Sequence, residues 1–236
     1  MAVIDPDLLL RAYAIGVFPM ADSRDAAEVF WVEPRRRAIL PLDRFRMSRS
    51  LRKTIRSDQF RVTRDKAFPQ VLRRCANREE TWINDEIQRS YEHLHELGHA
   101  HSIECWEGDA LVGGLYGVRL GAAFFGESMF SAARDASKVA LAWLVARLRV
   151  GGFHLLDCQF MTEHLRSLGA IEITQKDYVA LLSALLGASA PSSSVASGAA
   201  DGADFGALDR LLADEAEGGG SPAPGCVIAQ LLGQTS

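Results

Sequence analysis

The segment that decides the fold runs from His99 to Gln159. It reads His99-Ala-His-Ser-Ile-Glu-Cys-Trp106, Leu111-Val-Gly-Gly-Leu-Tyr-Gly-Val118 and Ala122-Ala-Phe-Phe-Gly-Glu-Ser-Met-Phe-Ser131, then a helix-like run, then Leu155-Leu-Asp-Cys-Gln159. Two turn-like connections at 107–109 and 119–121 separate the first three apolar segments and predict an antiparallel meander. A helix that starts at Asp135 or Ala136 and ends at Arg149 precedes the last strand.

Two acidic residues stand inside these apolar strands. Glu127 belongs to the third strand and Asp157 to the fourth. A buried carboxylate lowers stability unless it is paired or takes part in chemistry. Two interpretations follow: either both residues serve a reaction, or they form structural pairs with core arginines or backbone N–H groups.

Further helices and strands are expected on both sides of this segment. Asp5-Pro6, Ser48 and Asn84 have the character of helix starts, because their side chains can accept hydrogen bonds from free backbone N–H groups. Other expected strands are 29–32, 38–42, 60–63 and 170–173, and other expected helices are 67–75, 162–168 and 176–186.

Positive charge is concentrated in one part of the chain. Residues 35–78 contain 15 Lys and Arg against 3 Asp, a net charge of +12, whereas the whole chain has −4, so the remainder carries −16. Such a block is typical of a local site for a polyanion. The other interpretation is a solvated, arginine-rich helix face.

The helix expected after Ser48 carries part of this block. Arg49, Arg52, Lys53 and Arg56 follow one another at i, i+3, i+4 and i+7 and therefore share one face. Like charges at this spacing repel one another and weaken an isolated helix. The pattern therefore favours an anionic partner over a purely structural role.

The sequence gives little support to a metal, redox or membrane role. The four cysteines have no CxxC spacing, and His99 and His101 would need a third ligand to bind a metal. Hydrogen-bonded histidines at a strand entry are the favoured interpretation. No secretory signal and no membrane-spanning run is recognisable. We therefore expect a cytoplasmic protein without a cofactor.

Composition divides the chain into three expected parts. Residues 1–62 are expected to form a small N-terminal α/β domain with a basic segment, and residues 63–186 the larger domain that contains Glu127 and Asp157. Residues 187–236 are rich in Ala, Ser and Gly and are expected to be a flexible tail without a core of its own. Within that tail the apolar run Val227-Ile-Ala-Gln-Leu-Leu232 is expected to dock on the body as a short strand.

The order of strands and helices predicts an α+β fold with a mixed sheet flanked by helices. It resembles the acyltransferase fold of the N-acetyltransferase (GNAT) superfamily. Members that bind coenzyme A use a glycine-rich loop before the long helix, whereas the loop here, Ser131-Ala-Ala-Arg-Asp-Ala-Ser-Lys138, has no glycine. The resemblance implies acyl transfer, and the loop argues against coenzyme A.

Longer motifs resemble the leucyl/phenylalanyl-tRNA–protein transferase family, in order, over residues 5–186. They are Ala14-Ile-Gly-Val-Phe-Pro19, Trp31 followed by Pro34, Glu80-Thr-Trp-Ile83, His95-Glu-Leu-Gly-His-Ala-His-Ser-Ile-Glu104, Leu111-Val-Gly-Gly-Leu-Tyr-Gly117, Phe125-Gly-Glu-Ser-Met-Phe-Ser131, Ala136-Ser-Lys138 and Asp157-Cys-Gln159. The resemblance implies a bacterial cytoplasmic enzyme. Such an enzyme moves Leu or Phe, and less readily Met, from aminoacyl-tRNA to the N-terminal Arg or Lys of a protein, which marks that protein for N-end-rule degradation.

The same resemblance implies roles for particular residues. Asp157 and Gln159 lie next to the reacting groups, and Glu127 lies at the pocket, where its charge attracts the cationic acceptor. The residues implied at the donor amino acid are Leu115, Phe124, Gly126 and Ser128, those flanking the 3′ adenosine are Trp31 and Trp82, and those holding tRNA phosphates are Arg49, Arg52, Lys53 and Arg56. Phosphate contacts of this kind carry no sequence information.

The proton transfer has two possible routes. In one, Asp157 polarises Gln159, which draws the proton from the attacking amine. A neutral glutamine is a weak base, so the alternative is a shuttle through the terminal ribose hydroxyl, with Asp157 only as an orienter. Two other functions also stay open: a coenzyme A-dependent N-acetyltransferase and a non-catalytic tRNA-binding module.

Overall fold

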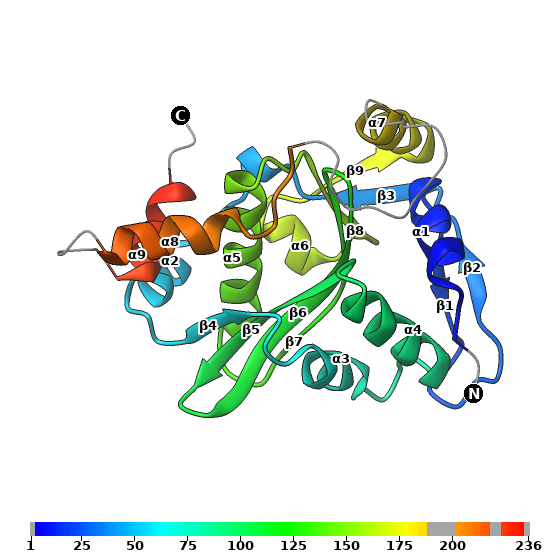
Figure 1. Ribbon diagram of the computed structural model, residues 1–236, viewed down its shortest axis with the longest axis horizontal. Helices are drawn as coiled ribbons and strands as arrows, with labels where there is room; N and C mark the ends of the chain where they lie inside the picture. The colour runs from blue at the N-terminus through cyan, green and yellow to red at the C-terminus, as the bar shows by residue number, and fades with distance from the viewer. Residues whose placement is uncertain (1–2, 188–201, 218–222, 234–236) are drawn as a thin grey trace.

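A seven-stranded mixed sheet carries the segment 99–159, and helices cover both of its faces (Figure 1). The computed structural model describes residues 3–187, 202–217 and 223–233. Their strands are β1 (Phe18–Met20), β2 (Phe30–Val32), β3 (Arg36–Ile39), β4 (Arg61–Arg64), β5 (Ala100–Glu107), β6 (Ala110–Leu120), β7 (Ala123–Ser131), β8 (Leu155–Gln159) and β9 (Ile171–Thr174). Their helices are α1 (Pro6–Ala14), the 3-10 helix η1 (Leu42–Arg44), α2 (Arg49–Arg56), α3 (Phe68–Ala76), α4 (Asp85–Glu96), α5 (Ala136–Val150), α6 (Glu163–Ser167), α7 (Gln175–Gly187), α8 (Ala207–Glu217) and α9 (Pro224–Leu231).

The strand order in the described sheet is β4-β5-β6-β7-β8-β3-β9. β5, β6 and β7 form the predicted antiparallel meander, and α5 connects β7 to β8, which pairs with β7 in parallel. The predicted α+β class with a mixed sheet is confirmed. The boundary expected after residue 62 falls inside β4, and β3 enters the sheet between β8 and β9, so the division into domains stays a prediction.

Alternating side chains of the central strands build two cores. Leu115 and Phe124 face one side and pack with α2, α5, α6, α8 and α9, whereas Tyr116 and Phe125 face the other side and pack with α1, α3, α4 and α7. All four side chains are buried. The period of two in β6 and β7 therefore decides which helices lie on which face.

The predicted helix starts are confirmed in atomic detail. The Asp5 carboxylate accepts from the backbone N–H of Leu8 at 2.8 Å, and the Asn84 side chain accepts from that of Ile87 at 2.9 Å. Ser48 caps α2 in the same way. These bonds satisfy backbone donors that the first helical turn leaves free.

The C-terminal segment differs from the expectation in two respects. Residues 227–231 of this run belong to helix α9 and Leu232 is its C-cap, so the run is not a strand. Pro224 occupies the first helical position, and a short apolar run does not by itself distinguish the two conformations. Phe205, Leu208 and Ile228 are buried in the main core, so the described parts of this segment pack on the body. Residues 188–201, 218–222 and 234–236 of the expected tail lie outside the described residues.

Gly225 allows α9 to pack against α2. A Cβ atom at this position would lie 1.9 Å from the Ile55 carbonyl oxygen, which is backbone and cannot turn away. We expect Gly225→Ala to lower the free energy of unfolding by about 1–3 kcal/mol, because the two helices must separate. Denaturant unfolding measures the effect. The matched control is Gly187→Ala, whose added Cβ meets nothing within 4 Å, and equal stability of the two variants would contradict this packing.

None of the helices in the described ranges has the length and apolarity that a membrane crossing requires. The described residues also contain no group of three or more His, Cys, Asp or Glu arranged to hold a metal ion. His101 instead forms a hydrogen bond with Asp65 (Nδ1 to Oδ2, 2.8 Å) and stacks on Phe205.

Candidate active site

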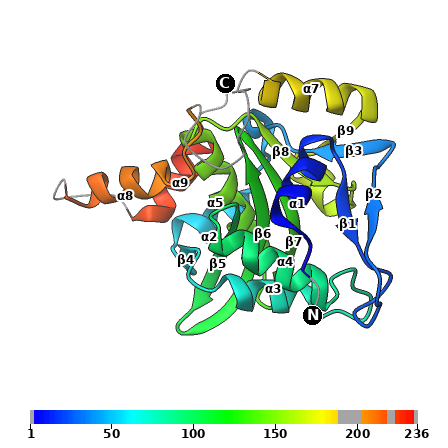
Figure 2. The same ribbon diagram turned by 45° about the vertical axis from the view of Figure 1, so that its right-hand side comes forward.

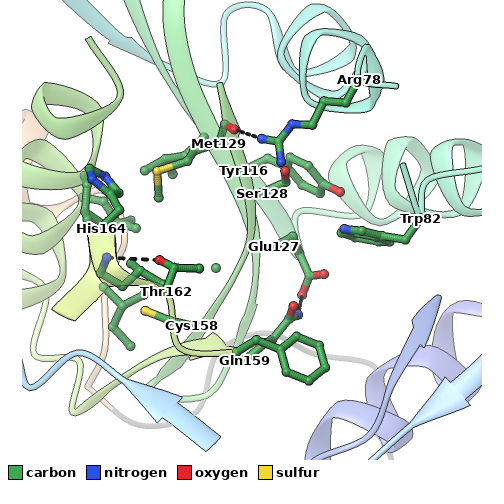
Figure 3. Close-up of a pocket in the computed structure, with 17 residues that line it drawn as sticks. Arg78, Trp82, Tyr116, Glu127, Ser128, Met129, Cys158, Gln159, Thr162 and His164 are labelled. Carbon is green, nitrogen blue, oxygen red and sulfur yellow. Dashed lines mark hydrogen bonds between the residues drawn. The ribbon is translucent and has the colours of Figure 1, made fainter. Parts of the chain in front are cut away.

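A pocket opens where β7 and β8 separate. The two parallel strands pair from Ala123 and Leu155 as far as Phe125 and Asp157. Residues 126–129 of β7 and 158–159 of β8 then line a cavity of about 250 Å³, together with residues of β6, α5 and α6 (Figure 3). The separation exposes the ends of both strands to a ligand.

The pocket has one apolar wall and one polar wall. The apolar wall consists of Leu115, Met129, Leu141, Leu144, Leu156, Cys158 and Leu165. Burial raises the pKa of the Cys158 thiol, which keeps it neutral. The polar part of the lining includes Glu127, Gln159 and the indole of Trp82, besides Arg78, Ser128, Thr162 and His164. A pocket of this composition suits an apolar side chain attached to a polar reacting group.

Glu127 points into the protein from a β-bulge. Tyr116 pairs with Ser128 and Gly117 with Gly126, so Glu127 is the extra residue of β7. Its carboxylate accepts hydrogen bonds from the Tyr13 hydroxyl (2.7 Å), the Gln159 side-chain amide (2.8 Å) and the Tyr91 hydroxyl (3.2 Å). Donors from α1, α4 and β8 thus meet at one carboxylate.

Burial dominates the electrostatics of Glu127. It raises the pKa of this carboxyl group to about 7, and the charge of Asp157 acts in the same direction, while the three hydrogen bonds lower the pKa. Burial also raises the pKa of Tyr13 and Tyr91, so both phenols remain protonated donors at neutral pH. Glu127 therefore changes its charge in the physiological range.

This pKa predicts a pH-dependent stability. Because the folded-state pKa of Glu127 lies above the ordinary value of 4.5 for a glutamate, its contribution to stability is complete below pH 4.5 and is lost as the pH rises through about 7. The difference corresponds to about 3 kcal/mol. We expect the unfolding free energy of wild type, minus that of Glu127→Gln, to fall by this amount between pH 4.5 and pH 8. A flat difference curve, measured by denaturant unfolding, would contradict a raised pKa.

Asp157 lies behind the pocket and does not line it. Its side chain is fully buried and accepts from the Arg37 guanidinium (2.5 to 3.0 Å), the Tyr178 hydroxyl (2.8 Å) and the backbone N–H of Gln159 (2.8 Å). Arg37, only 1% exposed, also donates to the carbonyl oxygen of Gly16. Asp157 is therefore both half of a buried ion pair and the anchor of the Gln159 backbone.

Gln159 joins the two carboxylates. Its backbone N–H donates to Asp157, and its side-chain amide donates to Glu127. The residue has a φ of 60°, a left-handed conformation that non-glycine residues adopt only when surrounding contacts hold them. Its side-chain oxygen has no hydrogen-bond donor among the described residues, and it remains available at the pocket wall.

The structure brings together six of the residues expected at the site. Glu127, Gln159, Leu115, Gly126, Ser128 and Trp82 all line the pocket. Phe124 does not line it: its ring is fully buried and stacks on Phe205 at 5.3 Å. Trp31 is 41% exposed on the β1–β2 ribbon, and the structure does not bring it to the pocket.

The basic residues of α2 form an open surface. Arg49, Arg52, Lys53 and Arg56 are exposed, while Leu51 and Ile55 anchor the helix in the core. Within the described ranges none of the four cations forms an ion pair. α2 lies with α8 and α9 at one end of the molecule, away from the β1–β2 ribbon (Figures 1 and 2).

Several residues of the site carry no signal in the sequence. Tyr13 and Tyr91 follow the apolar faces of α1 and α4, and Tyr178 that of α7, so their spacing indicates only a core. Arg37 is one of three consecutive arginines. Only its contact with Asp157 distinguishes Arg37 from Arg35 and Arg36, which are exposed.

Comparison with known proteins identifies relatives along the whole chain. The family model "Leucyl/phenylalanyl-tRNA protein transferase" matches residues 39–183, and the model of the N-terminal domain of the same family matches residues 3–35. The leucyl/phenylalanyl-tRNA–protein transferase of Rhizorhabdus wittichii is 62% identical over 248 aligned residues, which cover 100% of both chains. That of Novosphingobium aromaticivorans is 52% identical over 99% of this chain and 97% of its own.

Solved structures are more distant. The crystal structure of FemX aligns over 74% of this chain and 70% of its own, with 12% identity and a TM-score of 0.46, which is too low to support an inference. The family match rests on the sequence comparisons alone. They show that this chain belongs to the leucyl/phenylalanyl-tRNA–protein transferase family.

Proposed function

We propose that the chain transfers leucine or phenylalanine, and less readily methionine, from aminoacyl-tRNA to the N-terminal Arg or Lys of proteins. The observation that carries the proposal is the pocket between β7 and β8, where the pair Glu127–Gln159 faces an apolar wall. The names of the relatives describe this class of transfer. The product enters N-end-rule degradation, and the reaction takes place in the cytoplasm.

The apolar wall selects the donor amino acid. Leucine, phenylalanine and methionine are unbranched at Cβ and fit between Leu115, Leu144 and Leu156. A hydrophobic pocket distinguishes substrates by about 1–3 kcal/mol per methylene. Several apolar amino acids are therefore accepted, and β-branched ones are disfavoured by shape.

The reaction is aminolysis of an activated ester. The α-amine of the acceptor attacks the ester carbonyl, the carbon–oxygen bond to the ribose breaks, and the amine proton passes to the departing ribose oxygen. Such a step needs chiefly proximity and orientation. The side-chain oxygen of Gln159 accepts a hydrogen bond from the amine, because Glu127 holds the other end of this amide.

Asp157 acts through Gln159 in this proposal. The bond from the Gln159 backbone N–H to Asp157 fixes the left-handed turn that directs the amide toward Glu127. A neutral amide is a weak base, so transfer of the proton through the terminal ribose hydroxyl fits this arrangement better than transfer to Gln159 itself. Glu127 favours a cationic acceptor through its negative charge above pH 7.

The donor RNA is held by phosphate contacts. The exposed cations of α2 contact the acceptor stem without reading its sequence. Recognition therefore depends on the amino acid more than on the tRNA.

We also propose that the sheet is N-acetyltransferase-like, since a meander is followed by a crossover helix and a parallel strand. The loop at 132–135 contains no glycine for a coenzyme A pyrophosphate.

A transfer assay tests the function. We expect radiolabelled leucine to move from charged tRNA to proteins that begin with Arg or Lys, and not to those that begin with Asp or Glu, and RNase to abolish the transfer. Absence of transfer to all four would contradict the proposal. Thermal stabilisation by acetyl-coenzyme A would favour an N-acetyltransferase, and equal binding of charged and uncharged tRNA with an intact ester would favour a binding module.

A further inference from the structure

A second groove adjoins the pocket. It encloses about 420 Å³ and lies between the C-terminal end of α3, the end of β7 and the beginning of α5. Arg78, Met129 and His164 line both cavities, so the groove continues the pocket across this edge. Figure 3 shows Arg78 and Met129 on the side of the pocket across from Gln159.

The groove has the charge of an anion site. Arg74 and Arg78 are exposed, four residues apart, and neither forms an ion pair with a described residue. The guanidinium of Arg78 donates to the Met129 carbonyl oxygen, which holds this cation at the shared edge. None of the residues that line the groove carries a carboxylate.

The groove also offers neutral donors. The side chains of Asn77 and Ser137 form no hydrogen bond with the rest of the described chain, so a ligand would displace only water. Nε2 of His164 is buried without a partner in the described ranges. Burial and the nearby Lys138 lower the pKa of His164, which makes it a neutral hydrogen-bonding group at pH 7.

We propose that this groove holds the phosphodiester backbone of the donor RNA directly upstream of its terminal nucleotide. The inference rests on the proposed function: the ester end of the donor lies at Gln159, and the RNA must leave the pocket across one of its edges. Arg78 contacts the phosphate that lies nearest to the terminal nucleotide, and Arg74 contacts the next phosphate upstream. An acidic peptide is the less favoured occupant, because the groove is continuous with the pocket for the aminoacyl end.

Donors of different length test the proposal. We expect Arg74→Ala to raise KM about fivefold for leucyl-tRNA and for a leucylated trinucleotide CCA, and to leave leucyl-adenosine, which has no phosphodiester, unchanged. Arg74→Ala combined with Arg78→Ala is expected to raise KM about 25-fold, since the two sites contact different phosphates. The matched control is Arg73→Ala, because Arg73 is exposed on the same helix and does not line the groove.

Binding of an uncharged RNA tetranucleotide ending in CCA gives a readout without transfer. Arg74→Ala is expected to weaken it about fivefold and to make the slope of log Kd against log salt smaller by about 0.7. If Arg74→Ala weakens binding of the tetranucleotide but wild type does not transfer leucine, the groove is an RNA site and the proposed function is wrong. Three results with Arg74→Ala would each contradict the proposal that the groove binds RNA. They are unchanged binding of the tetranucleotide, an equally large rise in KM for leucyl-adenosine, and a change in KM for the acceptor protein only.

Discussion

Replacing Asp157 with asparagine is expected to lower the free energy of unfolding by about 3–5 kcal/mol. The change keeps the volume of the side chain and removes its charge, which leaves the guanidinium of Arg37, 1% exposed, without a counter-ion. A buried charge without a partner costs more than the lost hydrogen bonds. Denaturant unfolding at pH 7 measures the loss.

A double variant separates charge from position. In Arg37→Met with Asp157→Leu, apolar side chains replace both charges, and we expect it to be more stable than Asp157→Asn alone. Transfer should stay low in the double variant, because leucine at position 157 leaves the backbone N–H of Gln159 without its side-chain acceptor. Wild-type stability of Asp157→Asn would contradict the buried pair, and wild-type transfer by the double variant would contradict the positioning role of Asp157.

Replacing Gln159 with asparagine is expected to lower kcat by about 10²–10³-fold and to leave KM for the donor nearly unchanged. Asparagine tolerates the left-handed backbone at this position, so the turn after Asp157 is kept. Its amide is one methylene too short to reach both Glu127 and the amine. Single-turnover transfer with saturating leucyl-tRNA measures the step.

A matched change tests whether the amide itself matters. Gln159→Ala removes the amide completely and should lower kcat at least as much as asparagine does, while the thermal stability of the asparagine variant stays near that of wild type. Glu127→Ala should lower kcat in the same way, since Gln159 then loses its fixed acceptor. An asparagine variant with wild-type kcat would exclude the Glu127–Gln159 contact from the reaction.

Much of the fold is readable from local sequence. The caps at Asp5, Ser48 and Asn84 act within three residues of themselves, and the turns at 107–109 and 119–121 separate strands that then pair with each other. Neighbouring contacts of this kind leave a pattern in the chain. The place of β3 between β8 and β9 joins residues more than a hundred positions apart and leaves no such pattern.

The candidate site also combines residues that the sequence identifies with an arrangement that only the structure shows. Glu127 and Gln159 belong to recognisable motifs. The structure places Nε2 of Gln159 2.8 Å from Oε1 of Glu127. Phe124 belongs to the same motif region, but its ring is fully buried and stacks on Phe205, a residue of the C-terminal segment that packs on this face of the sheet. Trp31 stays on the ribbon formed with β1, a pairing that its own sequence does not specify.

The sequence by itself determined the family, the α+β class, the meander and the two carboxylates that need an explanation. It also determined that positive charge is concentrated in residues 35–78. Only the tertiary structure decided that Asp157 pairs with Arg37 behind the pocket and that Glu127 receives donors from α1, α4 and β8. The reason is physical: hydrophobic period and capping act over a few residues, whereas the environment of a buried charge depends on every element packed around it.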